Sequence, residues 1–312
     1  MISAHTTYGS APWWVTLSSS AIRSLPFGRY QLANALARFS SEPFVARLPR
    51  ELGGASFLCD LSDSIAREVC FTGRYEPQET QIAGRLLRPG MIAADVGANW
   101  GYFTLTCAHL VGPRGTVIAL EPHPLLSSTL AGNVTRNDLR QVEVLALAAG
   151  ARGGTRGFVG FARDGGNSGV SRGASSAERA DFESRIAALD DLLDERRQSR
   201  IDLTKIDIEG GEVDAIAGMS AGLAAGRYRF VLLECHPELI ARAGSTIERC
   251  LEPFTRAGYR GWRVDHSPAM HRRAALSEVP LADLLAPIDT ATLQHDPWPH
   301  LLWAAPGETL PA

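Results

Sequence analysis

Lysine is almost missing from this chain. Of its 312 residues, 31 are lysine or arginine, and a single one of these is a lysine, Lys205, in the stretch "LTKIDIEGG". Every other basic residue is an arginine, whereas position 205, beside acidic residues and glycines, has lysine, the more compact cation. Because the pKa of a lysine responds to burial and its stem is flexible, Lys205 is a candidate for a role that arginine fills poorly.

Other absences exclude whole classes of protein. The formal net charge is −3, and the basic residues form no stripe with interleaved aromatics, which argues against a nucleic-acid partner. The five cysteines include no CxxC pair, so neither a zinc site nor a disulfide framework is expected. A reducing, cytoplasmic location fits this cysteine usage best.

The first 22 residues carry no Asp, Glu, Lys or Arg, so we considered whether they form a targeting or membrane segment. Gly9, Pro12 and several serines interrupt the apolar residues, and there is no basic start. A secretory signal needs a charged start and an unbroken apolar core, and a membrane helix needs about 20 mostly apolar residues. The sequence therefore predicts neither, and no membrane partner.

The features that are present indicate an α/β protein. Hydrophobic residues make up 45% and charged residues 21%, which is ordinary for a globular chain. From residue 56 onwards, short apolar runs alternate with amphipathic segments, a pattern typical of a parallel sheet covered by helices. We predict a partly helical N-terminal extension at 1–54 and an α/β domain at 55–312. Within it, 150–183 is an inserted loop or hairpin, and 240–312 holds the last helix and two final strands.

The expected elements follow from apolar runs and helix stop signals. Helices are predicted in the extension over "ANALARF" and in the domain at 79–87, 101–111, 125–134 and 213–219, with a last one capped by Ser245 and Glu248 and running towards Gly258. Strands are predicted at 91–97, 116–121, 141–148, 200–208, 229–235, 258–264 and 300–306. The segment "RIAALDDLL" fits either a strand ending near Ala188 or a helix starting at Ile186.

The first strand ends in the stretch "DVGANWGY", which feeds a helix through glycines and so lets a ligand approach the backbone. Dinucleotides and S-adenosylmethionine both use this geometry. Asp95 at the strand tip would repel a pyrophosphate but attract an ammonium or sulfonium, and Asn99 stands where a dinucleotide fingerprint has its middle glycine. Charge therefore favours the methyl donor. Glu121, which ends the second strand, suits the ribose hydroxyls of either ligand.

In this order, "YEPQE", "DVGANWGYFTL", "ALEPHP", "NSG" and "KIDIEGGE" resemble the FkbM-type methyltransferases, over about residues 57–238. The resemblance implies a class I methyltransferase fold, which is Rossmann-like, with a seven-stranded, mostly parallel sheet, helices on both faces and an antiparallel last strand. It also implies S-adenosylmethionine as cofactor and a hydroxyl oxygen as the usual methyl acceptor. The cofactor-binding residues that it implies are Glu76, Asp95, Gly97, Ala98, Asn99, Gly101, Tyr102, Glu121, Pro122, Ala148 and Ala149.

Two departures from the family pattern concern the pocket. Gly211 stands where the family often has alanine, which should be tolerated, and Trp100 replaces a small aliphatic residue and could reshape the pocket floor. The loop motif Asn167-Ser168-Gly169 either touches the acceptor or forms a turn. An arginine-rich stretch with Arg156, Arg163 and Arg172 either meets an anionic or sugar-bearing acceptor or is simply solvated.

Titratable residues gather where the fourth and fifth strands end. Lys205, Asp207 and Glu209 share one face of the fourth strand, and His236 follows the fifth. Our hypothesis is that His236 is the general base, since the pKa of an imidazole lies near working pH. Asp207 and Glu209 would orient it, bind the acceptor hydroxyl or hold a divalent cation, which the sequence allows but does not support. A structural cluster is the alternative.

Lys205 is interpreted as a positioning residue that pairs with Asp207, in space too cramped for a guanidinium. Three functions remain open: an O-methyltransferase acting on a hydroxyl of a small metabolite or sugar moiety, a nicotinamide-dependent oxidoreductase, and a non-catalytic cofactor-binding module. Asp95 disfavours the second, and the joint presence of Asp207, Glu209 and His236 disfavours the third. The acceptor's identity and the oligomeric state are not determined by the sequence.

Overall fold

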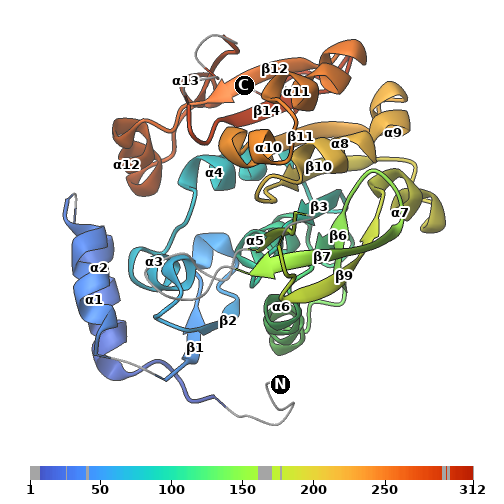
Figure 1. Ribbon diagram of the computed structural model, residues 1–312. Coiled ribbons are helices and arrows are strands. Elements are labelled where there is room, and N and C mark those ends of the chain that lie inside the picture. Colours follow the sequence, from blue (N-terminus) through green and yellow to red (C-terminus); the bar gives the residue numbers. More distant parts are fainter. Residues whose placement is uncertain are drawn as a thin grey trace.

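The computed structural model describes residues 8–25, 27–39, 42–160, 171–175, 178–289, 293 and 296–311 (Figure 1). Its helices are α1 (Trp13–Arg23), α2 (Arg29–Ala37), η1 (Arg50–Leu52), α3 (Ser64–Thr72), α4 (Pro77–Leu86), α5 (Tyr102–Val111), α6 (Pro124–Arg136), α7 (Leu189–Glu195), α8 (Glu212–Ala217), α9 (Ser220–Ala224), α10 (Pro237–Arg242), α11 (Ile247–Arg256), α12 (Pro268–Leu276) and α13 (Leu281–Leu284). Within this described part, none of the helices is both long and apolar enough to cross a membrane.

The central sheet has eight strands. They are β3 (Ile92–Val96), β4 (Thr116–Leu120), β5 (Val142–Leu145), β10 (Ile201–Ile206), β11 (Tyr228–Glu234), β12 (Arg260–Val264), β13 (Leu285–Pro287) and β14 (His300–Ala304), in the spatial order β13-β12-β14-β11-β10-β3-β4-β5. Neighbours from β11 to β5 pair in parallel, whereas β14 is antiparallel to both β11 and β12. The seven-stranded class I methyltransferase sheet is thus confirmed, with the short edge strand β13 added to it.

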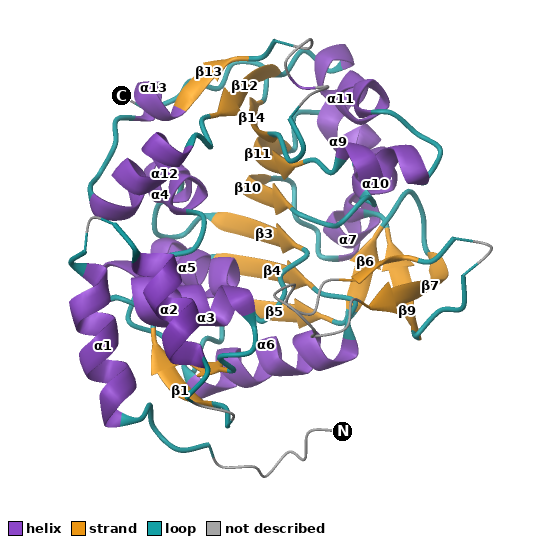
Figure 2. Ribbon diagram, turned by 60° about the vertical axis from the view of Figure 1, so that its left-hand side comes forward, coloured by secondary structure: helices purple, strands orange, loops and turns teal. Residues whose placement is uncertain are grey.

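Both faces of this sheet are buried because helices cover each of them. Successive strand residues point to opposite sides, so each strand contributes residues to both helical layers. Ala93 and Leu203 pack with α4 and α5, whereas Ala94 and Ile206 pack with the apolar residues of α7, α8 and α11. Figure 2 shows the two helical layers on either side of the strands. This arrangement explains why the sequence reads as continuous apolar runs rather than as an alternation of apolar and polar residues.

A second sheet stands beside the edge strand β5. Its strands are β6 (Leu147–Ala149), β7 (Gly154–Gly160), β8 (Ser171–Gly173) and β9 (Phe182–Ala187), in the order β6-β9-β7-β8. The single strand expected at 141–148 is therefore wrong in extent, because the chain leaves the central sheet at Ala146 and pairs with β9. The "RIAALDDLL" segment takes its strand alternative up to Ala187, and α7 begins at Leu189.

Several local predictions need correction. Thr246, not Ser245, caps α11: its side chain accepts a hydrogen bond from the Arg249 amide, and the helix starts one residue later than expected. The region 240–312 contains α12, α13 and β13 besides the predicted helix and strands. The helix predicted over "ANALARF" is confirmed up to Ala37, where α2 ends, but α2 begins earlier than predicted and α1 before it was missed.

The N-terminal segments form a layer over α5. The hairpin strands β1 (Phe44–Arg47) and β2 (Ser56–Cys59) pair antiparallel, and their apolar residues pack with α1, α3 and the start of α5. Trp100 belongs to this layer, since its ring stacks on Phe57 with the centroids 4.8 Å apart. The division of the chain at residue 54 stays a prediction, and the pairing of β1 with β2 runs across it.

Candidate active site

A cavity of about 600 Å³ opens at the carboxyl ends of β3, β4, β10 and β11. This is the edge of an open α/β sheet at which ligands bind. The second sheet contributes one wall through Ala148, Ala149, Phe158 and Ile186. The predicted cofactor-binding residues Glu76, Asp95, Gly97, Ala98, Asn99, Tyr102, Glu121 and Pro122 all line this cavity, whereas Gly101 does not.

The turn after β3 has a backbone that only certain residues accept. Gly97 has a φ of +87°, and a Cβ on it would lie 1.9 Å from the carbonyl oxygen of Asp207, so a side chain is excluded there. Asn99 also has a positive φ, 51°, as does Glu76 at 42°. Non-glycine residues in this region carry strain and often mark functional sites. Both residues line the cavity, which supports its selection as the site.

Glu121 organises this turn. One carboxylate oxygen accepts a hydrogen bond from the backbone N–H of Asn99 at 2.8 Å, and the other accepts one from His123 at 2.8 Å. Burial raises the pKa of Glu121 to about 7, although these two hydrogen bonds oppose that rise. Each carboxylate oxygen has a further lone pair. Glu121 therefore retains capacity for two hydroxyl donors from a ligand.

Asp95 lies deeper in the same cavity and is almost fully buried. Its Oδ2 accepts a hydrogen bond from the Thr104 hydroxyl at 2.5 Å, and burial raises its pKa to about 6. Tyr102 is held by its own hydroxyl, which accepts a hydrogen bond from the Tyr75 amide at 3.2 Å.

The two departures from the family pattern are accommodated. Trp100 lines the cavity from the N-terminal layer, and a Cβ on Gly211 would meet Ile208 at an ordinary contact distance of 3.4 Å.

The single lysine lies at the centre of a buried group of acids, here called the Lys205 cluster: Lys205, Glu76 and Asp207. The Lys205 Nζ is 2.7 Å from Asp207 Oδ2 and 3.3 Å from Glu76 Oε2. Burial would lower the pKa of Lys205, but Asp207 and Glu76 raise it well above its usual value. The predicted pair with Asp207 is confirmed as a contact. The approach to Glu76 was not foreseen, because Glu76 precedes α4, far away in the sequence.

His236 lies behind the cavity rather than in its wall. Its Nε2 is 3.5 Å from Glu234 and 3.6 Å from Glu209, both of which line the cavity. Its Nδ1 is 2.6 Å from Glu212, the first residue of α8. Burial opposes protonation, but the hydrogen bond and charge of Glu212, with Glu234 and Glu209, raise the pKa of His236 to about 9. His236 is thus close to Glu209, as expected, and is held in its charged form near neutral pH.

Sequence reasoning gave no role to Glu234 or Glu212. Glu234 lines the cavity, and its Oε2 is buried with no hydrogen-bond partner among the residues that the structure describes. Burial and the neighbouring Asp207 raise the pKa of Glu234 to about 8. Its position at the tip of a buried strand was the available signal. Glu212 ends the "KIDIEGGE" motif, but its contact with His236 depends on how α8 packs.

The arginine-rich stretch is divided between cavity and surface. Arg156 and Arg172 line the cavity rim, where Arg156 pairs with Asp214 at 3.1 Å and Arg172 pairs with Glu178. Arg163 and the motif Asn167-Ser168-Gly169 fall outside the described residues. The choice between an acceptor-binding and a solvated role for these arginines stays open.

Comparison with known proteins relates the sequence of this chain to a methyltransferase family. Residues 95–260 match the family model described as the methyltransferase FkbM domain. The 31-O-demethyl-FK506 methyltransferase FkbM of Streptomyces tacrolimicus is 33% identical over 177 residues, 48% of this chain and 67% of that protein. The AMB antimetabolite synthetase AmbE of Pseudomonas aeruginosa is 27% identical over 200 residues, 53% of this chain but only 9% of that protein. A solved structure of methyltransferase FkbM from Methylobacillus flagellatus is 15% identical, covering 88% of this chain and 59% of that one, with a TM-score of 0.40.

The sheet order and the cavity at its carboxyl edge define a protein of the class I methyltransferase fold. Within that class, the chain belongs to the FkbM methyltransferase family, because the family model matches more than half of it. The resemblance drawn from the sequence motifs is confirmed.

Proposed function

We propose that this chain uses S-adenosylmethionine to methylate a hydroxyl oxygen of a small molecule, such as a metabolite or a sugar moiety. The observation that carries the proposal is one cavity that joins the carboxylate of Glu121, the candidate for the ribose hydroxyls, to a group of titratable side chains around Glu234. The family membership supports methyl transfer as the reaction. The hydroxyl acceptor is inferred from the chemistry of those side chains.

The residues in the cavity fit this cofactor. Buried carboxylates at Asp95 and Glu121 face a space of about 600 Å³, which is within the usual range for small-molecule sites. Glu121 has lone pairs for the ribose hydroxyls, and Asp95 is suited to the cationic methionine end. Ala148 and Ala149 offer an apolar surface for the adenine. When bound, S-adenosylmethionine supplies an electrophilic methyl group on a sulfonium.

The remaining chemistry is to orient the acceptor and remove its proton. The Glu234 side chain lines the cavity and is 13% exposed, and in this proposal it accepts a hydrogen bond from the acceptor hydroxyl and then its proton. His236 Nε2 lies 3.5 Å from Glu234 Oε1. We therefore assign the general base to Glu234, and His236, whose charged form is favoured near neutral pH, orients its carboxylate. Lys205 and Glu209 position Asp207 and His236.

The cofactor is tested by calorimetric titration of the purified protein with S-adenosylmethionine, S-adenosylhomocysteine and NAD. We expect saturable binding of the first two and none of NAD, because Asp95 repels a pyrophosphate. Binding of NAD alone would overturn the proposal in favour of an oxidoreductase. Binding of S-adenosylmethionine without methyl transfer to any member of a broad panel of hydroxyl compounds would favour a non-catalytic module.

Replacement of Glu234 with glutamine should lower the rate of methyl transfer roughly 100-fold or more, because loss of a general base commonly costs that much. In the parent, the rate should fall as pH drops below about 8, since protonated Glu234 cannot accept a proton. The measurement is the rate of S-adenosylhomocysteine release at about every pH unit from roughly pH 6 to 10, with a hydroxyl compound that the panel has shown to be methylated.

Glu238→Gln is the matched control, because Glu238 is an exposed glutamate on α10 that pairs with Arg242. It should keep the parental rate and pH profile. A parental rate in Glu234→Gln together with a large loss in His236→Ala would move the base to His236 alone. Parental rates in both variants would remove the assignment of a base to either residue.

A further inference from the structure

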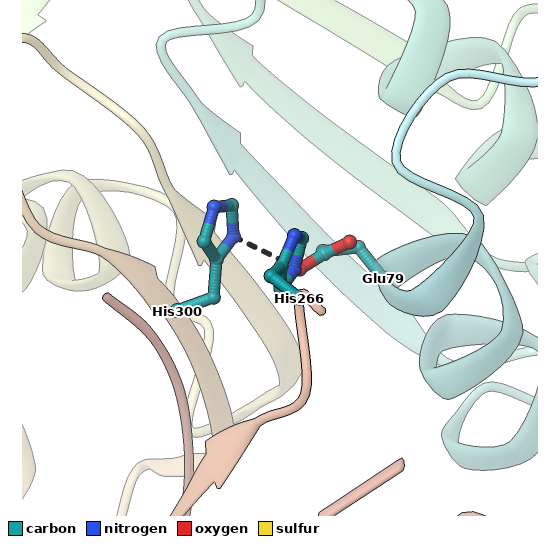
Figure 3. A group of neighbouring side chains, drawn as sticks. All are labelled: Glu79, His266 and His300. Atoms are coloured by element: carbon teal, nitrogen blue, oxygen red, sulfur yellow. Dashed lines mark hydrogen bonds and ion pairs between the residues drawn. The ribbon is translucent and has the colours of Figure 1, made fainter. Parts of the chain in front are cut away.

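A second cluster of titratable side chains also approaches Glu234, through His300. It is called the Glu79 cluster and consists of Glu79, His266 and His300. Figure 3 shows the two imidazole rings lying against each other, with the carboxylate of Glu79 reaching them from α4. The ring centroids are 3.7 Å apart, and one carboxylate oxygen, Glu79 Oε1, is 2.6 Å from His266 Nε2 and 2.9 Å from His300 Nδ1.

The hydrogen bonds in this cluster leave part of it unsatisfied. The side chain of Glu79 is 2% exposed, and its second oxygen, Oε2, has no hydrogen-bond partner within the described part of the chain. A buried carboxylate oxygen without a partner is costly. Two imidazole nitrogens, His266 Nε2 and His300 Nδ1, converge on the other oxygen, Glu79 Oε1. Two stacked rings that were both protonated would repel each other, whereas two neutral rings can share a bound cation.

We propose that Glu79, His266 and His300 form a binding site for a divalent transition-metal ion of the zinc type. Two neutral imidazoles and one carboxylate are ligands that such ions prefer. Their ligand atoms lie within 4.8 Å of one another, and tetrahedral bonds of about 2.1 Å place ligand atoms about 3.4 Å apart. Occupation would therefore require only small side-chain movements.

The position of the cluster suggests what the ion would do. Glu79 belongs to the first turn of α4, His266 follows β12, and His300 begins β14, so one ion would join three separate elements. The other nitrogen of His300, Nε2, lies 3.7 Å from Glu234 Oε1. A metal ion on Nδ1 of His300 and the carboxylate of Glu234 near its Nε2 would together fix the orientation of the ring. The ion is thus a structural and positioning element that is not itself part of the methyl transfer.

A neighbouring group, Asp207, Glu234 and His236, also brings three ligand atoms within 4.8 Å. It is less suited to a cation, because the Lys205 ammonium is 2.7 Å from Asp207. A second positive charge at this place would be repelled by Lys205. Among the residues that the structure describes, no lysine or arginine forms an ion pair with the Glu79 cluster.

The site can be tested without any methyl acceptor. Untagged protein, stripped with a chelator and dialysed, would be titrated with Co²⁺, whose visible absorption reports coordination by protein ligands. We expect about one Co²⁺ per chain, displaced by Zn²⁺, and a higher melting temperature with Zn²⁺. His266→Gln should weaken Co²⁺ binding at least about 100-fold, because loss of an outer partner alone costs 10- to 100-fold.

His109→Gln is the matched control, since it removes an exposed histidine on α5 that lies outside both clusters. It should bind Co²⁺ as the parent does. No Co²⁺ binding by the parent, or parental binding by His266→Gln, would overturn the proposal. Glu79→Gln provides a second test if His266→Gln loses its native circular dichroism. Binding that survives both substitutions but is lost in Asp207→Asn would place the ion in the neighbouring group, and this too would overturn the proposal.

Discussion

Replacement of Glu121 with alanine should weaken the binding of S-adenosylmethionine by two to four orders of magnitude. Two hydrogen bonds from ribose hydroxyls to a buried carboxylate contribute about 1.5–3 kcal/mol each, and the variant loses both. The same carboxylate also holds the backbone amides of Asn99 and His123 at 2.8 Å. Its removal therefore loosens the turn after β3 as well. Isothermal titration calorimetry of parent and variant measures the change.

Glu143→Ala is the matched control for this variant. Glu143 is a carboxylate on the adjacent strand β5, but it faces solvent and pairs with Arg196. We expect the control to bind S-adenosylmethionine with the parental affinity. A Glu121→Ala protein that is folded by circular dichroism and binds within about threefold of the parent would show that the ribose is held elsewhere.

Replacement of Lys205 with methionine should lower the free energy of unfolding by about 3–5 kcal/mol, because it leaves buried carboxylates without their cation. Lys205 is 5% exposed, and its ammonium contacts Asp207 and Glu76, so little water can replace it. Denaturant unfolding followed by circular dichroism gives this free energy. The double variant Lys205→Met/Asp207→Asn should recover part of the loss, since one of the stranded charges is then removed.

The Lys205→Arg variant tests why the chain keeps a lysine here. A guanidinium is larger and planar, and the ammonium already lies 5.7 Å from the centre of the Phe103 ring. We expect a loss of about 1–3 kcal/mol from crowding, together with slower methyl transfer. Equal stability and equal kinetics in Lys205→Arg would show that either cation suffices. A Lys205→Met protein as stable as the parent would show that the acids of this cluster are protonated in the folded state.

The central elements could be predicted from the sequence because their signals are local. The strand over residues 92–96 is apolar except for Asp95, and the glycines that follow it mark the turn. The alternation in "LTKIDIEGG" correctly places Lys205 next to Asp207. The third strand was harder, because "QVEVLALA" is one apolar run that divides at Ala146 between two sheets. Composition does not show where a strand changes partner.

The site was predicted in part for the same reason. Asp95, Gly97 and Glu121 lie at strand ends, where the topology brings them together whatever the rest of the chain does. Glu212, His300 and Glu79 were missed because their partners are remote in the sequence. His236, for example, meets Glu212 only because α8 turns back against the end of β11. Such contacts depend on helix packing, which no short motif encodes.

The sequence by itself determined the fold class, the family and the carboxylates Asp95 and Glu121 that line the cavity. These depend on residue type and on spacing along the chain, which short-range backbone geometry converts directly into position. Only the tertiary structure decided that Lys205 is shared between Asp207 and Glu76, that His236 lies behind Glu234, and that Glu79 meets two histidines. Charges in a buried site take their partners from whichever elements pack there, and burial in turn sets their protonation.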